Sequence, residues 1–238
     1  MTTPSVVRIT ELEHEPGLVH GFSTTALGTV GLSHAPDPAP VLEARRKFAG
    51  ALSLRFEQLT VAGAVHGAAI ARVDLAGGTI EGVDGLITDR PDVALFATFA
   101  DCYPIVLWDP VRRCAGLVHA GWRGTVAGAA AAAVRAMGEE FGSNPEDLKA
   151  GIGPGICGNC YEVGDEVASR FDPGLSRPGG GDRRLLDLAA ANAAQLHAAG
   201  VRRVHLSGLC TKETPYLPSH RRSPDGTRFG GIVAIRRP

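Results

Sequence analysis

The chain lacks a segment suited to crossing a membrane or to directing export. Its start, MTTPSVVRITELEHEPG, carries acidic residues and prolines where a secretory signal needs a basic head and an apolar run of about 7–15 residues. The most apolar long stretch, Val126–Met137, is mostly alanine, contains Arg135 and is shorter than the roughly 18 residues of a membrane span. We therefore expect a cytoplasmic protein without a membrane partner.

The chain also has few cysteines and almost no net charge. The five cysteines are an odd number in a mid-sized chain, which disfavours a disulfide framework and favours reduced thiols or metal ligands. Lys and Arg number 24 against 25 Asp and Glu, so the formal net charge of -1 gives no general attraction to nucleic acid. No nucleic-acid partner is expected.

The chain does have enough apolar material for a sizeable core. Hydrophobic residues make up 44% of its 238 residues, and strand-like runs mix with helical segments without a long linker. We therefore predict one α+β domain over residues 1–238. Asp187–Ala199 is a predicted helix, with Asp187 able to cap its start and Gly200 able to end it. Tyr161–Phe171 is also predicted to be helical, and Arg177–Arg184 to be a mobile surface loop.

Three segments at predicted strand ends each hold a residue that could bind a metal: His66 in VHG, Cys102 in ADCYP and His119 in VHAGW. Their intervals follow no local spacing rule, but each residue adjoins a turn from which its side chain can enter a shared cleft. Two imidazoles and a thiolate suit Zn²⁺ with a fourth position open, and copper accepts the same set. The alternative is two capping or surface histidines and a buried cysteine. Asp101 either orients a ligand histidine or caps a turn.

The segment HAGWRGT, which starts at His119, leads into an alanine-rich helix. Glycines such as Gly124 let a ligand approach the backbone, while the N–H groups of a helix start and the charge of Arg123 attract anions. A phosphate site is one interpretation, and an ordinary helix start is the other. The chain has no GxxxxGK[ST] loop, so nucleoside triphosphate hydrolysis has little support.

Cys157 and Cys160 form one CxxC pair, which is typical of half a zinc ribbon or of a redox dithiol. No second CxxC completes a ribbon, so a turn with half-buried thiols is the expected arrangement. Cys114 lies in a predicted strand and is expected in the core. Cys210 ends a predicted strand and either lines the same cleft as the three candidate ligands or packs in the interior.

Three arginines lie among small residues near the C-terminus, namely Arg221, Arg222 and Arg228. Guanidinium groups in this number could bind a phosphate, a carboxylate or a partner surface. The alternative is a solvated basic loop.

Taken together, VHG, ADCYPIVLWDP, GLVHAGWRGTVAG, GIGPGICGNCYEVG and SHRR followed by GTR resemble the YfiH/YlmD family. That family is also described as laccase-domain, polyphenol oxidase or peptidoglycan editing factor proteins. The similar motifs occur in order from His20 to Ile235. The resemblance implies a single-domain α/β/β/α sandwich and a zinc site formed by His66, Cys102 and His119.

The resemblance further implies a zinc-dependent purine nucleoside phosphorylase that cleaves adenosine, inosine or methylthioadenosine, with adenosine deaminase activity in some members. Its partners are then a small-molecule nucleoside and phosphate. The three metal ligands and Arg123 would be catalytic, with Arg123, Gly124 and Asp101 at the phosphate. Two departures concern substrate contacts. Thr25 stands where the family often has an arginine, and Ala64 stands where a glutamine usually precedes VHG.

Three other functions remain open at this point. A copper-dependent polyphenol oxidase would use the same ligands, although three ligands are too few for clustered coppers. A quality-control factor for peptidoglycan precursors would present the loop Arg221–Arg228 to a partner in cell-wall synthesis. A thiol hydrolase would use Cys102 as nucleophile and a histidine as base.

Overall fold

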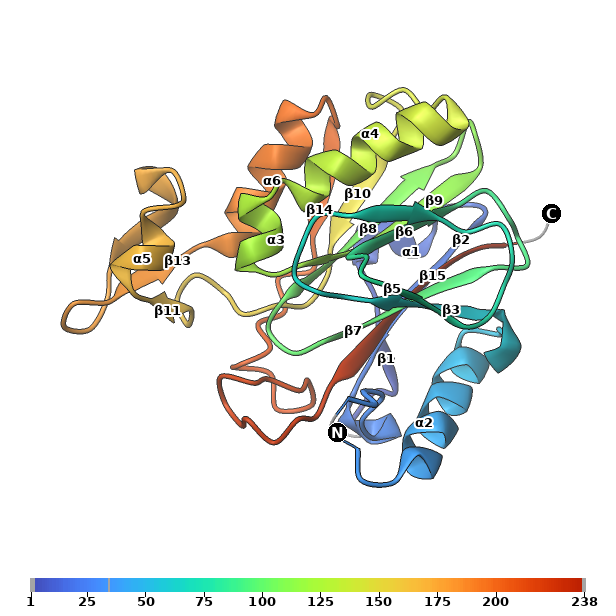
Figure 1. Cartoon of the computed structure of the whole chain (residues 1–238), viewed down its shortest axis with the longest axis horizontal. Coiled ribbons are helices and arrows are strands. Elements are labelled where there is room, and N and C mark those ends of the chain that lie inside the picture. The colour runs from blue at the N-terminus through green and yellow to red at the C-terminus, as the bar shows by residue number, and fades with distance from the viewer. Residues whose placement is uncertain (1–2, 34, 237–238) are drawn as a thin grey trace.

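The computed structural model describes residues 3–33 and 35–236 and has two stacked six-stranded sheets at its centre (Figure 1). The first sheet has the order β1-β2-β15-β7-β3-β5 and contains β1 (Val6–Val7), β2 (Leu18–Ser23), β3 (Leu59–Gly63), β5 (Thr79–Glu81), β7 (Ala94–Phe99) and β15 (Phe229–Ile235). The second has the order β14-β10-β8-β9-β6-β4 and contains β4 (Ile70–Arg72), β6 (Gly85–Thr88), β8 (Tyr103–Asp109), β9 (Cys114–Ala120), β10 (Lys149–Ile152) and β14 (Arg203–Leu206). Both sheets mix antiparallel and parallel pairs.

A small third sheet and several helices complete the described chain. The third sheet contains β11 (Glu162–Val163), β12 (Ser176–Pro178) and β13 (Arg184–Leu186). The helices are α1 (Thr10–Glu13), α2 (Pro38–Ala51), α3 (Trp122–Val126), α4 (Ala129–Phe141), α5 (Asp165–Ala168) and α6 (Leu188–Ala198), with 3₁₀ turns at Thr25–Leu27, Phe56–Gln58 and Pro173–Leu175. Among these described helices, none is long and apolar enough to span a membrane.

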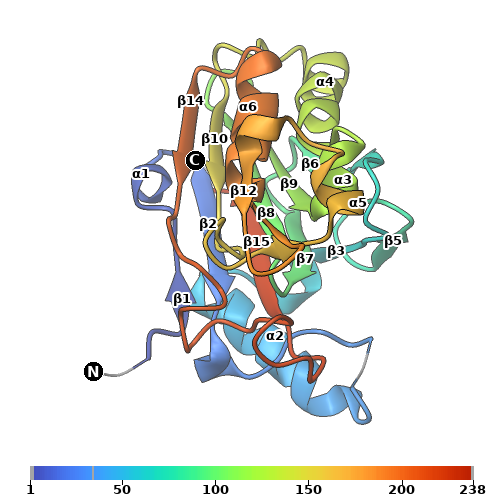
Figure 2. The ribbon, with the colours of Figure 1, turned by 90° about the vertical axis from the view of Figure 1, so that its left-hand side faces the viewer.

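Helices cover the outer faces of the two large sheets (Figures 1 and 2). Helix α2 packs Phe48 into the same apolar cluster as Ile232 of the first sheet. Helices α4 and α6 place Met137 and Leu196 in a cluster with Ile105 of the second sheet. Each of these contacts removes apolar surface from water, which is the main force that holds the layers together.

The inner faces of the two sheets form a further core between them. Phe99 and Val233 of the first sheet share this cluster with Val106, Trp108 and Leu117 of the second. Because helices or the opposite sheet cover both faces, every residue of β8, β9 and β15 is buried, and apart from Asp109 and His119 these strands are apolar throughout rather than alternating. The layer order is therefore helix, sheet, sheet, helix, and the α/β/β/α sandwich of the α+β class is confirmed.

The segment between β10 and α6 differs from its prediction. Tyr161–Phe171 is not one helix: β11 and the four-residue α5 share it, with Gly164 in extended backbone at the start of α5. Arg177–Arg184 is not simply a loop, because its ends pair in β12 and β13, with Pro178 opposite Arg184. The prediction failed because these strands pair only with one another, in a small unit that lies apart at the left of Figure 1.

The following helix is confirmed together with its end signals. The Asp187 carboxylate accepts a hydrogen bond from the Ala190 N–H at 2.9 Å, which satisfies a donor that the helix itself cannot. Gly200 ends the helix with a φ of +95°, a conformation that favours glycine.

Candidate active site

The structure brings His66, Cys102 and His119 together at one edge of the sandwich. One potential ligand atom from each lies within 4.8 Å of the others, and the two imidazole centroids are 4.9 Å apart. The register of the second sheet explains the convergence. His119 of β9 pairs with Pro104 of β8, two residues after Cys102, so the 17-residue interval is closed by strand pairing. We call these three residues the His–Cys–His cluster.

Gly121 leaves the space in which this cluster assembles. A Cβ atom at Gly121 would lie 2.8 Å from the Cys102 Sγ and 3.3 Å from the His66 ring. The first of these distances is shorter than normal van der Waals contact. This glycine, two residues after His119, therefore allows the thiol to approach both imidazoles.

The Asp84 carboxylate, which is fully buried, holds two parts of the cluster. Its Oδ1 accepts the His66 N–H at 2.8 Å, and its Oδ2 accepts the N–H groups of Gly67 at 2.6 Å and Val65 at 3.2 Å. These bonds fix the His66 backbone at a φ of +63°. The same Oδ1 lies 3.1 Å from Nδ1 of His119, which leaves Nε2 of that ring for a ligand.

Asp84 was not among the predicted site residues. It precedes Gly85 at the start of β6, and an Asp-Gly pair ordinarily indicates a turn. Its pKa reflects its position: burial opposes ionisation, but the hydrogen bonds from His119 and from the Gly67 and Val65 backbone outweigh burial and lower the pKa. Asp84 is therefore a carboxylate that stays charged and orients the cluster.

The cluster also has the electrostatics of a metal-binding thiolate. Burial would raise the pKa of the Cys102 thiol, but the neighbouring His119 and His66 lower it to about 6. Burial would lower the pKa of His119, yet the Cys102 thiolate and Asp84 raise it to about 9. Without a metal, Cys102 and His119 therefore form a thiolate–imidazolium pair at neutral pH.

The donor set fits a single zinc ion. Ligand atoms at about 2.0–2.3 Å from a tetrahedral zinc lie roughly 3.3–3.8 Å from one another, a spacing that small side-chain movements within the observed cluster can reach. Three protein ligands leave one position open, which is the arrangement of catalytic rather than structural sites. Copper accepts the same two imidazoles and thiolate in a different geometry.

The cluster lies in a cavity of about 520 Å³. Three arginines, Arg123, Arg221 and Arg228, line this cavity together with the cluster. Asp101 and the ring of Tyr161 also contribute to its wall. A volume of this order accommodates a small organic ligand, and the excess of guanidinium groups favours an anionic one.

Asp101 lines the cavity but does not orient a ligand histidine. Its Oδ1 accepts the Thr211 hydroxyl at 2.6 Å, and its Oδ2 accepts the Arg221 N–H at 2.7 Å. Its backbone has a φ of +81°, which places it in the left-handed region just before Cys102. Of its two predicted roles, the structure therefore supports the turn, while Asp84 has the orienting position.

Arg123 and Gly124, the two predicted phosphate residues of α3, have different surroundings. Arg123 lines the cavity, with its guanidinium carbon 4.4 Å from the centroid of the Trp122 ring. Gly124 is buried and is not part of the cavity wall; a Cβ there would lie 2.7 Å from the Gly67 carbonyl oxygen. Its small size therefore serves the close packing of α3 on the loop after His66.

The three arginines near the C-terminus do not form a uniform basic loop. Arg221 and Arg228 line the cavity, whereas Arg222 donates to the carbonyl oxygens of Thr211 at 2.6 Å and Lys212 at 3.0 Å. Arg222 therefore supports the preceding segment at Thr211 and Lys212 rather than the loop Arg221–Arg228. The sequence could not separate these roles, because all three residues stand among the same small neighbours.

The two departures from the family pattern also differ in position. Ala64 is part of the cavity wall, so the shorter side chain enlarges the space beside His66. Thr25 lies in a 3₁₀ turn, donates its N–H to the Tyr216 carbonyl at 2.9 Å and is not among the residues of the wall. Of the two, Ala64 is the one that can contact a ligand in this cavity.

The sandwich, with a His–Cys–His cluster beside a basic cavity, defines a protein of the laccase-domain class. Residues 19–236 match the family described as multi-copper polyphenol oxidoreductase laccase. The chain belongs to this family, whose members include the YfiH and YlmD proteins.

Individual relatives agree with this assignment. A purine nucleoside phosphorylase of Deinococcus radiodurans is 37% identical over 232 residues, covering 92% of this chain and 89% of its own length. The structure of YfiH from Bacillus licheniformis superposes with a TM-score of 0.91 at 31% identity, covering 98% of this chain and 97% of that one. YlmD from Geobacillus stearothermophilus superposes with a TM-score of 0.88 at 34% identity, covering 93% of both chains.

Proposed function

We propose that the protein is a zinc-dependent purine nucleoside phosphorylase that acts on adenosine, inosine or methylthioadenosine. The observation that carries the proposal is that one cavity holds both the His–Cys–His cluster and three arginines, Arg123, Arg221 and Arg228. Relatives that cover most of this chain are named purine nucleoside phosphorylases, which supports the same activity.

The arginines supply the phosphate site of the proposed reaction. Guanidinium groups bind phosphate oxygens through paired, charge-assisted hydrogen bonds. Arg221 is held at the cavity by two contacts, because its Nη1 donates to the Glu162 carbonyl at 2.7 Å and its guanidinium carbon is 5.3 Å from the Tyr161 ring centroid. Arg123 is similarly stacked on Trp122. Such contacts restrict the side chains before phosphate binds.

The nucleoside would occupy the part of the cavity beside Tyr161 and Ala64. An aromatic ring gives a purine a stacking surface, and the small Ala64 side chain leaves room for a base or sugar. In this proposal the sugar would lie between the phosphate held by the arginines and the His–Cys–His cluster. Asp101 keeps Arg221 in place through its backbone N–H.

In the proposed reaction, an oxygen of hydrogenphosphate forms a bond to C1′ of the sugar while the bond from C1′ to the purine nitrogen breaks. The proton of the hydrogenphosphate leaves with the base, so the products are a sugar 1-phosphate and the free purine. Positive charge develops on the sugar during this step, and a phosphate held beside it stabilises that charge.

Zinc, when bound, supplies a Lewis acid that polarises a substrate oxygen or activates water for adenosine deamination. The chain's own contribution is to prepare the ligands. Asp84 fixes His66 and orients His119, and the two histidines keep Cys102 as a thiolate. Phe99 packs beside His119, with 5.4 Å between ring centroids, and shields one side of that ring from water.

The decisive experiment measures release of purine from adenosine, inosine and methylthioadenosine with and without phosphate. Wild-type protein of known zinc content is expected to need phosphate, and His119→Ala is expected to lose zinc and turnover together. Arg123→Met should raise the KM for phosphate by about 10–100-fold, the value of one charge-assisted interaction. Arg202→Met, at an exposed arginine paired with Glu146, is the matched control and should leave KM unchanged.

Other outcomes of this experiment would contradict the proposal. Equal base release without phosphate would indicate a hydrolase, and full activity of zinc-free protein would remove the metal from the reaction. Conversion of adenosine to inosine, followed in the same samples, tests the deaminase activity. Covalent trapping of Cys102 by substrate in zinc-free protein would instead favour a thiol hydrolase.

A copper-dependent polyphenol oxidase is the second candidate, because the family description names it and because two imidazoles and a thiolate also bind copper. Oxygen uptake with a phenol, by copper-loaded protein but not by its Cys102→Ala variant, would support it. A role as a partner in peptidoglycan-precursor quality control stays a prediction. Within the loop Arg221–Arg228, only Arg222 is an arginine that does not line the cavity, so this role requires that neutralising Arg222 abolishes a cellular phenotype while nucleoside cleavage persists.

A further inference from the structure

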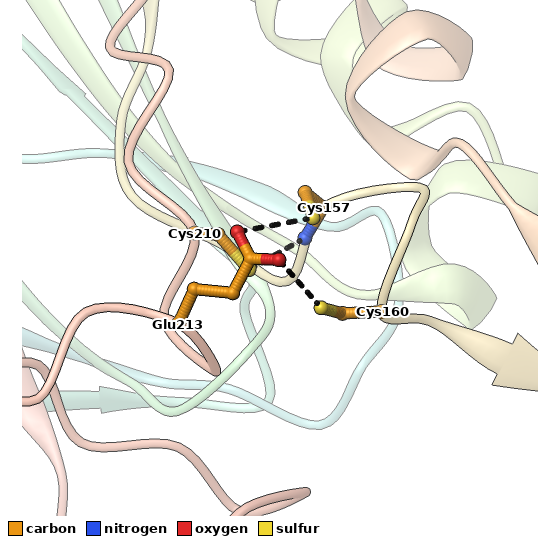
Figure 3. A group of neighbouring side chains, drawn as sticks. All are labelled: Cys157, Cys160, Cys210 and Glu213. Atoms are coloured by element: carbon orange, nitrogen blue, oxygen red, sulfur yellow. Dashed lines mark hydrogen bonds between the residues drawn. The ribbon is translucent and has the colours of Figure 1, made fainter.

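A second group of potential ligands, drawn in Figure 3, contributes no residue to the wall of the cavity. Cys157, Cys160 and Cys210 are free thiols, and one ligand atom from each, together with one from Glu213, lies within 4.8 Å of all the others. Cys210 therefore joins the CxxC pair rather than the His–Cys–His cluster. We call these four residues the thiol cluster.

The fold assembles the thiol cluster from two distant segments. Gly155 and Cys210 form a parallel β-bridge, in which Gly155 donates to the Leu209 carbonyl at 3.2 Å and Thr211 donates to the Gly155 carbonyl at 3.0 Å. This bridge sets the segment before the CxxC beside the segment that follows β14. Gly155 is required here, because a Cβ would lie 2.4 Å from the Tyr103 ring.

The CxxC itself forms a tight turn. The N–H groups of Cys160 and Tyr161 both donate to the Cys157 carbonyl, at 2.9 and 3.0 Å. The turn directs both sulfur atoms toward Glu213, whose Oε1 is 3.3 Å from Sγ of Cys160 and whose Oε2 is 4.0 Å from Sγ of Cys157. The Cys157 N–H donates to Sγ of Cys210 at 3.4 Å, as Figure 3 shows. Four donors thus surround one point.

We propose that the thiol cluster is a second metal site, which binds Zn²⁺ through Cys157, Cys160, Cys210 and Glu213. Sulfur is a strong zinc ligand and a carboxylate oxygen is an accepted fourth one, and the sulfur atoms of a tetrahedral zinc site lie about 3.8 Å apart. Four protein ligands leave no open position, so this site is structural. The CxxC pair supplies two of the four ligands, and Cys210 and Glu213, some fifty positions later in the sequence, supply the other two.

The second site has a direct structural connection to the cavity. Thr211, which follows Cys210, donates its hydroxyl to Asp101 of the cavity wall. The carbonyl oxygens of Thr211 and Lys212, in the turn that follows Cys210, accept hydrogen bonds from Arg222. The adjacent Arg221 lines the cavity. A zinc ion in the thiol cluster would therefore hold the turn that positions Arg221, without contacting the substrate.

The test is the zinc content of the full-length reduced protein, measured by inductively coupled plasma mass spectrometry after removal of loosely bound metal. Two zinc ions per wild-type chain are expected. Cys102→Ala should retain one, and the double variant Cys160→Ser/Cys210→Ser should also retain one. Cys114→Ala is the matched control, because Cys114 is buried in β9 beside Ser143, and it should keep both ions.

Cobalt substitution identifies the ligands. In the Cys102→Ala protein, bound Co²⁺ should show thiolate-to-cobalt charge-transfer absorption, and the further change Cys160→Ser should weaken it. Glu213→Gln changes an exposed residue and serves as a variant that should stay folded. Its circular dichroism should match that of wild type, while a lower chelator concentration should suffice to remove its zinc. A Cys102→Ala protein that is folded, holds no zinc and gives the same thiol titration with and without added zinc would overturn the proposal. So would a disulfide within the cluster in protein purified under reducing conditions.

Discussion

Replacement of Asp84 by asparagine should damage both the His–Cys–His cluster and the fold around it. Each carboxylate oxygen accepts two hydrogen bonds: Oδ1 from His66 N–H and His119 Nδ1, Oδ2 from the N–H groups of Val65 and Gly67. An asparagine has one acceptor oxygen, so in either orientation its NH₂ group faces two donors. Loss of two charge-assisted bonds of about 1.5–3 kcal/mol each predicts a decrease of about 3–6 kcal/mol in unfolding free energy.

The same change should weaken metal binding, because His119 loses either its partner or the charge that orients it. Removal of a carboxylate behind a ligand histidine typically costs 10–100-fold in metal affinity. Chelator competition gives the zinc affinity, and urea unfolding of metal-free protein gives the stability. Asp74→Asn, at an exposed carboxylate paired with Arg72, is the control and should change stability by less than about 0.5 kcal/mol. Unchanged zinc affinity in a folded Asp84→Asn protein would refute the reasoning.

Three further predictions concern single residues. In metal-free protein, alkylation of Cys102, followed by peptide mass mapping, should have its pH midpoint near the lowered pKa of about 6, and His119→Ala should move that midpoint upward; an unmoved midpoint would exclude the ion pair. Gly121→Ala should weaken zinc binding in a folded protein because its Cβ would lie 2.8 Å from the thiol, whereas Gly50→Ala, with nothing within 4 Å, should not. Burial, and next the charge of Arg8, lower the pKa of His20 to about 4. As the pH falls, the unfolded chain therefore binds this proton before the folded chain does. Urea unfolding should show that the free energy of unfolding decreases by about 3 kcal/mol between pH 6.5 and pH 4. His20→Gln should remove this part of the pH dependence.

The sequence was most informative where local signals and burial agree. Strands such as β8 and β9 are covered on both faces, so apart from Asp109 and His119 their residues are apolar, and the strands can be predicted without knowledge of their partners. Asp187 caps the start of α6 and Gly200 ends the helix, both by interactions within a few residues. The three ligands of the His–Cys–His cluster were candidates from their places at predicted strand ends, but only the resemblance to a family favoured one shared site, since strand register, not spacing, brings them together.

What the sequence could not indicate depends on contacts between distant segments. Asp84 acts through residues 17 to 35 positions away, and nothing around it distinguishes a buried carboxylate from a turn. Cys210 is 53 residues from Cys157, so the CxxC could not be seen as part of a larger cluster. Arg222 differs in role from Arg221 and Arg228 because carbonyl groups of distant residues accept its hydrogen bonds, and the sequence does not show those contacts.

The His–Cys–His cluster draws its members from both large sheets. His66 follows β3 of the first sheet, His119 belongs to β9 of the second, and Cys102 lies on the connection from β7 to β8. An ion bound by all three would cross-link the sheets much as a disulfide joins two segments, and the sandwich could not open without releasing it. A ligand that binds only the folded state adds about 2.7 kcal/mol to the unfolding free energy at 100 times its Kd. The unfolding free energy of the chain would then follow the metal concentration of its surroundings.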